Sequence, residues 1–149
     1  MTQQEHILTI PSATQYLAEV RRFVEKRART AGLPDDVVDQ FKLAVDEACS
    51  NVIEHAYAGE ASHTIDIKVV SNAARFTVLI RDQGRSFEPQ HYRSPDLFDL
   101  VQHRKDGGFG VHLMRRLMDR VEYRRRGSVN EVSLTKYVPE GTLNAEARS

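Results

Sequence analysis

The sequence has few of the features that characterise secreted, membrane or disulfide-bonded proteins. It contains one cysteine, Cys49, and no tryptophan. A single cysteine excludes an internal disulfide and fits a reducing compartment. No apolar run approaches the roughly 20 residues of a membrane helix, and the N-terminus lacks the basic and apolar segments of a signal peptide. We therefore expect a cytoplasmic protein without a membrane segment.

The chain also has no formal net charge, because 21 lysines and arginines balance 21 aspartates and glutamates. Bulk attraction to nucleic acid or to an anionic membrane is therefore not expected. The run Arg124-Arg125-Arg126 has no aromatic platform beside it, which favours a solvated face or a protein-docking patch. The six histidines show no zinc-ligand spacing with the cysteine.

The overall composition, 40% hydrophobic and 28% charged over 149 residues, favours one globular domain spanning 1–149. Apolar residues at helical spacing predict helices from Ser12, from Pro34 to about residue 56, and after Gly110. Alternating apolar residues predict strands over 6–10, 65–69, 76–80, 121–126 and 131–138, with turns at 71–74 and 127–128. Because these helices can cover only one sheet face, we expect an α+β two-layer sandwich with a mixed, mostly antiparallel sheet.

Two segments lack these periodic patterns. Residues 85–106 carry Pro89 and Pro95 among mixed polar and apolar residues, and a connection this long is often a functional lid. We expect a lid there, with room for a short helix over 95–102. The tail over 139–149 is small and polar, and we expect it to fray.

Polar side chains interrupt the second predicted helix at regular intervals. Glu47, Asn51 and His55 are spaced four residues apart and form one row. Glu47 and Asn51 lie at the edge of the apolar stripe, whereas His55 lies nearer its middle. A carboxylate can accept a proton, and an amide oxygen is a hard neutral ligand suited to Mg²⁺. Taken alone, such a pair is more often the polar flank of an amphipathic helix.

Two glycine-containing turns add further candidates. Asp82-Gln83-Gly84 ends a strand and ordinarily indicates a turn. A buried carboxylate there can also accept from an exocyclic amine such as that of adenine, with Gly84 allowing close approach of the base. Gly107-Gly108-Phe109-Gly110 begins a helix, where free backbone N–H groups bind phosphates. No Gly-Lys-Ser/Thr follows, so this turn is not a P-loop.

In this order, the three motifs resemble those of the ATPase superfamily shared by gyrase, Hsp90, histidine kinases and MutL. Within it, the chain resembles the anti-sigma factor serine/threonine kinases of bacterial partner-switching systems. The stretch 47–57 carries this likeness, with glutamate, asparagine, histidine and a following aromatic in register, and the preceding 42–46 has the same character. The resemblance covers roughly residues 7 to 138 and implies the Bergerat-type ATP-binding fold.

The resemblance also implies a role for each motif residue. Glu47 would be the general base that takes a proton from a serine or threonine of a partner, or from water. Asn51 would coordinate Mg²⁺, and Asp82 would bind the adenine amino group with Gly84 beside the base. The turn residues Gly107, Gly108 and Gly110 would hold the phosphates of ATP under the lid.

Two positions depart from the family pattern. Arg85-Ser86-Phe87 follows the Asp-x-Gly turn, where the family often has a further glycine or proline before phenylalanine. Asn130-Glu131 stands where the last strand often begins Gly-Thr and supplies a hydroxyl near adenine. No contact is assigned to Asn130-Glu131, and Ser133 or Thr135 is the candidate substitute for that hydroxyl.

The main hypothesis is a cytoplasmic, ATP- and Mg²⁺-dependent serine/threonine kinase. It would phosphorylate a small antagonist protein and sequester a sigma factor when free, without contacting nucleic acid directly. A homodimer is expected from the resemblance only. The alternative is an ATP-dependent interaction module that hardly turns over. A detached histidine-kinase catalytic domain is disfavoured, because no helical hairpin with a phosphoacceptor histidine precedes the motif.

Overall fold

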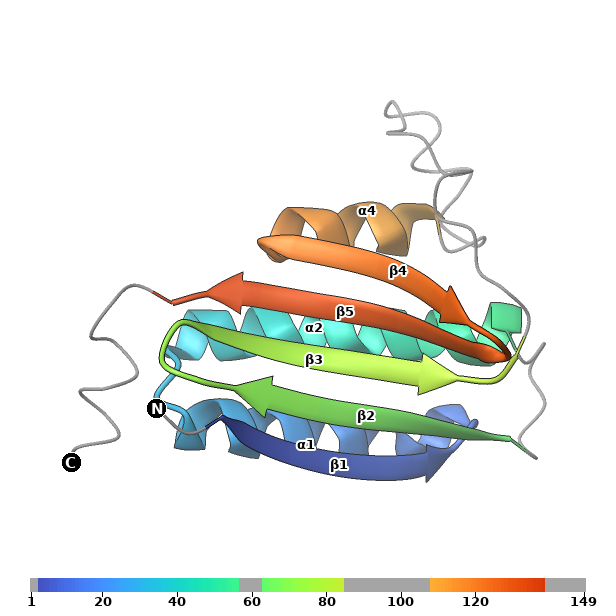
Figure 1. The fold of residues 1–149 in the computed structure, drawn as a ribbon, viewed down its shortest axis with the longest axis horizontal. Helices are drawn as coiled ribbons and strands as arrows, with labels where there is room; N and C mark the ends of the chain where they lie inside the picture. The colour runs from blue at the N-terminus through green and yellow to red at the C-terminus, as the bar shows by residue number, and fades with distance from the viewer. Residues whose placement is uncertain (1–2, 57–62, 85–107, 139–149) are drawn as a thin grey trace.

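The computed structural model describes residues 3–56, 63–84 and 108–138 (Figure 1). The elements in these ranges are the strands β1 (Gln4–Pro11), β2 (Thr64–Ser71), β3 (Arg75–Asp82), β4 (Arg120–Arg126) and β5 (Val129–Tyr137), the helices α1 (Leu17–Thr30), α2 (Asp35–Asn51) and α4 (Gly108–Leu117), the short 3₁₀ turn η1 (Thr14–Tyr16) and the π-helical turn η2 (Val52–Ala56). The predicted lid, its short helix and the tail lie outside the described residues.

The five described strands form one sheet in the order β1-β2-β3-β5-β4. Each neighbouring pair is antiparallel, so the expectation of a mixed sheet is wrong for this part of the chain. Two of these four pairs, β2–β3 and β4–β5, are hairpins, which can only be antiparallel. The second hairpin inserts β5 between β3 and β4, so two segments far apart in sequence pair at the centre of the sheet.

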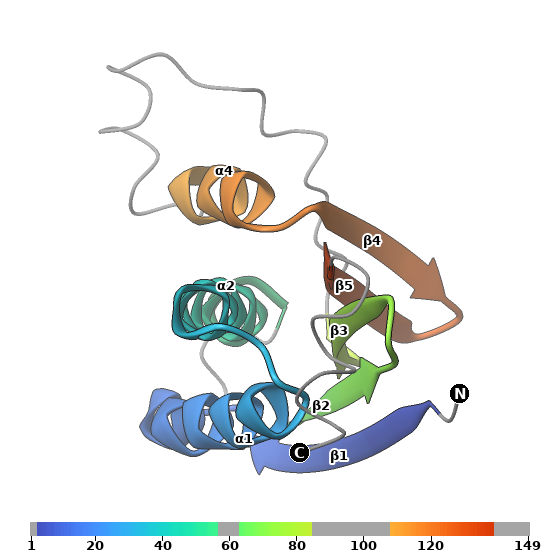
Figure 2. The same cartoon turned by 90° about the vertical axis from the view of Figure 1, so that its left-hand side faces the viewer.

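The helices cover one face of this sheet, as expected for a two-layer sandwich (Figure 2). Side chains alternate along the strands, so that Ile65 and Ile67 of β2 and Val78 and Ile80 of β3 are fully buried under the helices. The predicted stripe of α1 supplies Leu17, Val20, Val24 and Ala28 to the same core. The periodicity of the sequence therefore identifies the core correctly.

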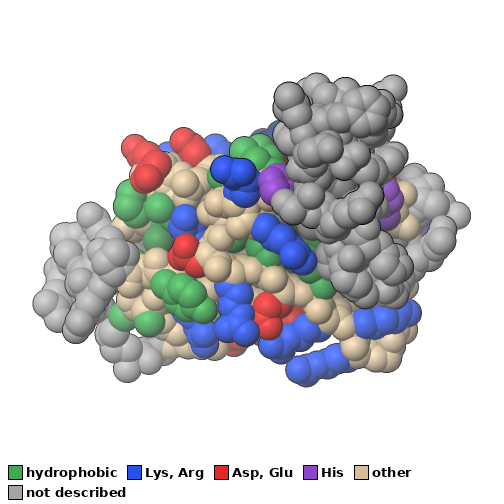
Figure 3. Space-filling view, turned by 90° about the horizontal axis from the view of Figure 1, so that it is seen from above, with side chains coloured by type: hydrophobic (Ala, Val, Ile, Leu, Met, Phe, Trp, Pro, Cys, Tyr) green, Lys and Arg blue, Asp and Glu red, His purple; other side chains and the backbone are tan. Residues whose placement is uncertain are grey.

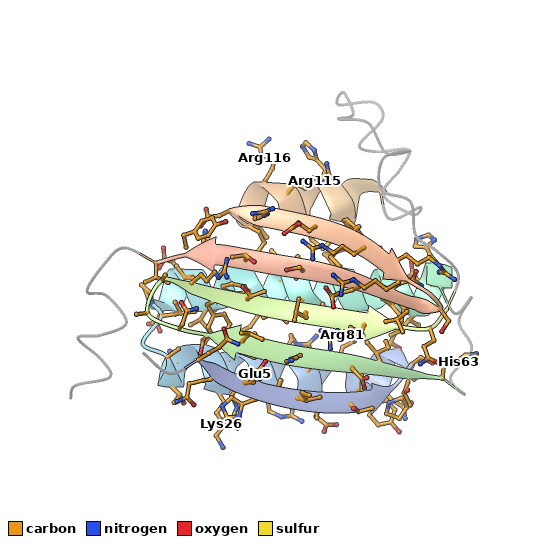
Figure 4. The ribbon with its side chains drawn as sticks, viewed as in Figure 1. Glu5, Lys26, His63, Arg81, Arg115 and Arg116 are labelled. Carbon is orange, nitrogen blue, oxygen red and sulfur yellow. The ribbon has the colours of Figure 1, made fainter. Side chains whose placement is uncertain are left out.

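The opposite face of the sheet carries polar and charged side chains, among them Glu5 and Arg81 (Figure 4). Lys68 pairs with Glu5 at 2.9 Å, and Arg81 pairs with Glu131 at 2.6 Å. These cross-strand ion pairs are partly exposed, so each stabilises the sheet only slightly.

Helix α2 runs along the middle of the sheet, in the direction of β3 (Figure 1), and has well-defined ends. Pro34 precedes its first turn in an extended conformation, and Asp35 and Asp36 lie at its positive end. The helix is regular to Asn51 and then widens into η2. We expected one regular helix to about residue 56, so the π-helical turn is a correction.

No helix in the described ranges is long and apolar enough to cross a membrane. The predicted glycine turn at 107–110 is incorporated into a helix, because α4 begins at Gly108. Gly107 itself lies outside the described residues.

An aromatic pair holds α2 against the sheet. The rings of Phe41 and Phe76 meet edge to face with centroids 5.0 Å apart, and neither side chain is exposed. We expect Phe76→Ala to lower the free energy of unfolding by about 3–5 kcal/mol, because it removes buried area and leaves a cavity. Ile7→Ala is the control, because Ile7 is 61% exposed and should change stability by less than about 0.5 kcal/mol. Equal effects of the two variants in denaturant titrations would contradict this account of the core.

Candidate functional site

The predicted site residues come from three segments that meet at one end of the molecule. The C-terminal end of α2, the end of β3 and the start of α4 all lie on the right in Figure 1. Helix α4 packs against α2, and α2 lies beside β3 on the covered face of the sheet (Figure 2). The fold thus brings Glu47, Asn51, Asp82, Gly108 and Gly110 to the same end of the sandwich.

Glu47 lies one helical turn before Asn51 on α2 and is partly buried. Burial raises the pKa of its carboxyl group above the usual value, and the neighbouring carboxylates of Asp46 and Glu54 raise it further. A carboxylate with a raised pKa is a stronger base. The environment of Glu47 therefore suits a group that takes up a proton.

Asn51 is more buried than the sequence pattern indicated, with only 7% of its surface exposed. Its Nδ2 is buried and has no hydrogen-bond partner among the described residues. Buried amides are normally paired, so Nδ2 of Asn51 is available to donate a hydrogen bond to a ligand. Asn51 also directly precedes η2, and π-helical turns are frequent at functional sites. The wider turn means that His55 does not continue the predicted i, i+4 row.

Asp82 is the last residue of β3 and faces the helices, with 6% of its surface exposed. Its Oδ1 accepts a hydrogen bond from the backbone N–H of Gly84 at 2.9 Å, which confirms the predicted turn. The same oxygen accepts a second hydrogen bond from Nδ2 of Asn130, also at 2.9 Å. The described residues donate no hydrogen bond to Oδ2, which is left to accept from a ligand.

Asn130 is the residue that sequence reasoning missed. It lies on β5 directly opposite Asp82, and its Nδ2 also donates to the Gly84 carbonyl at 3.0 Å. The suggestion that Ser133 or Thr135 replaces the family hydroxyl is wrong, because both project from the opposite face of the sheet. There Thr135 Oγ1 lies 3.0 Å from Thr77 Oγ1. Strand alternation could have revealed this, since residue 130 shares a face with the apolar Val132 and Leu134.

The first turn of α4 contains Gly108 and Gly110. The first N–H groups of a helix have no intrahelical partner, and the helix dipole makes this end positive. Such an end suits an anion such as phosphate. Within the described ranges, no three His, Cys, Asp or Glu side chains gather as a metal site. Mg²⁺ often takes only one or two protein ligands beside phosphate and water, so one amide ligand fits that ion.

Cys49 behaves as the ordinary structural interpretation predicted, whereas the arginine run only partly does, because Arg124 pairs on the exposed surface and Arg125 reaches Asn130. Burial raises the pKa of the Cys49 thiol to about 12, so it is an inert core residue rather than a nucleophile. On β4, Glu122 pairs with Arg120 at 2.8 Å and with Arg124 at 2.9 Å. Basic side chains are interspersed with acidic ones on the side seen in Figure 3.

Comparisons with known proteins agree with this geometry. Residues 10–136 match the family described as histidine kinase-like ATPase domain. The chain is 31% identical over 135 residues to the serine-protein kinase RsbW of Halalkalibacterium halodurans, covering 88% of this chain and 82% of that protein. It is 32% identical over 136 residues to the RsbW of Bacillus velezensis, covering 88% and 84%.

Two solved structures share the fold. The structure of the RsbU and RsbW domains of a Mycobacterium tuberculosis protein aligns with a TM-score of 0.61 at 15% identity, covering 92% of this chain and 34% of that one. The SiaB–SiaC complex of Pseudomonas aeruginosa aligns with a TM-score of 0.58 at 10% identity, covering 89% of both chains.

The buried carboxyl group of Glu47 predicts a pH-dependent cost in stability. Its folded-state pKa is raised above the usual 4.5, so the cost is present at neutral pH. This cost disappears below about pH 4, where the group is protonated whether the chain is folded or unfolded. We expect Glu47→Gln to be more stable than wild type at pH 7, with the difference vanishing near pH 4, as measured by denaturant unfolding. Glu19→Gln, at an exposed position in the first turn of α1, should be neutral or slightly destabilising. A Glu47→Gln variant less stable than wild type at pH 7 would contradict the prediction.

Proposed function

The chain belongs to the anti-sigma factor serine/threonine kinases of the histidine kinase-like ATPase family, and we propose that the end of α2, β3 and α4 is its phosphoryl-transfer site. The protein is an ATP-dependent serine/threonine kinase. The observation that carries the site assignment is the pair on α2, a carboxyl group with a raised pKa one helical turn from an asparagine whose buried Nδ2 has no partner among the described residues. Both lie near the C-terminal end of α2, the helix against which α4 packs.

Glu47 acts as the general base in this proposal. The hydroxyl oxygen of the substrate serine or threonine attacks the γ-phosphorus, the bond to the β–γ bridging oxygen breaks, and ADP leaves. Glu47 accepts the hydroxyl proton, which its raised pKa favours. The rest of the rate enhancement comes from positioning and from neutralising phosphate charge.

Asn51 and the start of α4 hold the polar end of the nucleotide. The Asn51 amide oxygen ligates Mg²⁺, which supplies charge neutralisation to the phosphates when it is bound. The backbone N–H groups at Gly108 and Gly110, with Gly107 before them, donate to phosphate oxygens. The buried Nδ2 of Asn51, which has no partner among the described residues, is a donor and suits a phosphate oxygen. Ligation of Mg²⁺ by the amide oxygen is proposed from the family resemblance.

Asp82 and Gly84 hold the base. Asp82 Oδ2 accepts from the exocyclic amine of adenine, while its Oδ1 stays bound to the turn. The absence of a side chain at Gly84 lets the backbone approach the ring. In this arrangement the base and the phosphates lie on two sides of the end of α2.

The substrate we propose is a small antagonist protein of the anti-anti-sigma type, carrying the phosphorylated serine or threonine. The free kinase binds a sigma factor, which the antagonist releases when it is not phosphorylated. We place this cycle in the cytoplasm, where ATP and sigma factors occur together. A homodimer is proposed from family likeness alone.

The kinase assignment predicts a specific loss in Glu47→Gln. Removing a general base typically costs 10²–10⁴-fold in rate, so phosphoryl transfer should fall about 100-fold or more while the ATP dissociation constant changes less than about threefold. The assay incubates the protein with Mg-ATP and each small antagonist-type protein of the source organism, and measures the added phosphate by mass spectrometry. ATP binding with no transfer from wild type to any of these proteins would favour the non-catalytic interaction module instead.

The metal assignment predicts that Asn51→Leu separates stability from ligand binding. Leucine has a similar size and leaves no buried polar group unpaired, so the ligand-free protein should be as stable as wild type or more so. Wild type should gain thermal stability when Mg²⁺ is added to a fixed ATP concentration, and Asn51→Leu should lose most of that gain. A full Mg²⁺-dependent shift in Asn51→Leu would remove Asn51 from the metal site.

A further inference from the structure

We propose that Asn130, held in orientation by Arg125, positions the Asp82 carboxylate and thereby sets the preference of the site for a 6-amino purine over a 6-oxo purine. This inference rests on the proposed function, because it concerns the base-binding end of the same nucleotide site. Asn130 does not need to contact the base; it acts through Asp82.

The two carboxylate oxygens of Asp82 differ in their hydrogen bonds. Oδ1 receives two hydrogen bonds, from the Gly84 N–H and from Asn130 Nδ2, both at 2.9 Å. A carboxylate oxygen has about two lone-pair sites, so Oδ1 is filled. Oδ2 receives none from the described residues, so it is the acceptor that remains. Asn130 thus helps to select which oxygen of Asp82 can meet a ligand.

The orientation of the Asn130 amide is set by its other contacts. Nδ2 lies 3.0 Å from the Gly84 carbonyl oxygen, where only a donor is favourable. On the other side, Arg125 Nη1 donates to Asn130 Oδ1 at 2.6 Å. A flipped amide would place donor against donor and acceptor against acceptor. Arg125 therefore keeps Nδ2 directed at Asp82.

Arg125 also contacts the Asp82-Gln83-Gly84 turn directly. Its Nη1 lies 3.4 Å from the Gly84 carbonyl oxygen, so it braces the turn that follows Asp82. Although Arg125 is on the exposed edge strand β4, it lies directly opposite Asn130 in the hairpin. Its neighbours Arg124 and Arg126 project from the other face of the sheet, so only one arginine of the run reaches the site.

Burial of Asp82 and Asn130 increases the effect of losing their hydrogen bond. Asp82 and Asn130 are 6% and 9% exposed, so water can replace a lost hydrogen bond only poorly. Without Asn130, the Asp82 carboxylate loses a restraint on its rotation, and Oδ2 no longer has a fixed direction. An adenine amine donates to a fixed Oδ2, whereas the 6-oxo group of hypoxanthine presents a second acceptor and is disfavoured. Loss of the restraint should therefore reduce discrimination between these two bases.

The experiment compares ATP with inosine triphosphate, which carries the 6-oxo group, by calorimetric titration in the presence of Mg²⁺. For wild type we expect clear preference for ATP. Asn130→Ala should lower the ratio of the two affinities about tenfold, mainly by weakening ATP. Asn130→Thr should recover part of the ratio, because its hydroxyl can donate one hydrogen bond to Asp82 Oδ1. Arg125→Ala should lower the ratio about threefold, and Arg124→Ala, the matched control, should leave it unchanged.

The outcomes separate this inference from the proposed function. A purely structural role for Asn130 would weaken both nucleotides equally, and an unchanged ratio in Asn130→Ala would overturn the inference. Asp82→Asn is the reference variant, since it should lose the preference for ATP while keeping the Oδ1 contacts. If wild type shows no preference, or if Asp82→Asn retains it, the assignment of the nucleotide site itself is wrong.

Discussion

The contact between the apolar face of α2 and the helix-facing side of β3 determines where Glu47, Asn51 and Asp82 lie. Phe41 and Phe76 fix the two elements against each other, and both elements run in the same direction (Figure 1). From Phe41 to Asn51 the helix advances ten residues, or about 15 Å at 1.5 Å per residue. From Phe76 to Asp82 the strand advances six residues, or about 20 Å. The amide of Asn51 and the carboxylate of Asp82 therefore lie at the same end of the sandwich, although the aromatic contact that aligns their two elements is apolar.

Placing polar groups at the end of a core element has a thermodynamic cost. The raised pKa of Glu47 means that its charged form is disfavoured by burial, and Asn51 Nδ2 is buried without a partner among the described residues. A sequence selected for stability alone would have apolar residues at both positions. The cost is local, since the remaining buried residues of α2, such as Phe41 and Val45, are apolar. This contrast supports interpreting the pair as a site rather than as a polar flank.

Much of this arrangement follows from local patterns in the sequence, and the rest depends on contacts between distant segments. The periodicity of apolar residues predicts the helices, the strands and the covered face, because side-chain spacing alone decides them. The burial of Asn51 could not be predicted, because it depends on which distant segments pack around the end of α2. The π-helical turn at 52–56 leaves no comparable signal in the side-chain types. The pairing of Asp82 with Asn130 joins strands that are not consecutive, so no turn sequence determines its register.

That register has a consequence for the base-binding end of the site. Gly127 takes a positive φ of 60° in the turn of the last hairpin, a conformation that favours glycine, and the pairing that follows sets Arg125 opposite Asn130. Pairing of β5 with β3 then sets Asn130 opposite Asp82. A slip of one residue would exchange the two faces of β5 and bring Glu131 or Val129 beside Asp82. Glu131 would place a second carboxylate there, and Val129 would leave Oδ1 without its side-chain donor. The geometry of Asp82 therefore depends on the pairing of β3 with β5 and, through Arg125, on a turn more than forty residues away. These two pairings explain how an asparagine that matches no family motif can be part of the site.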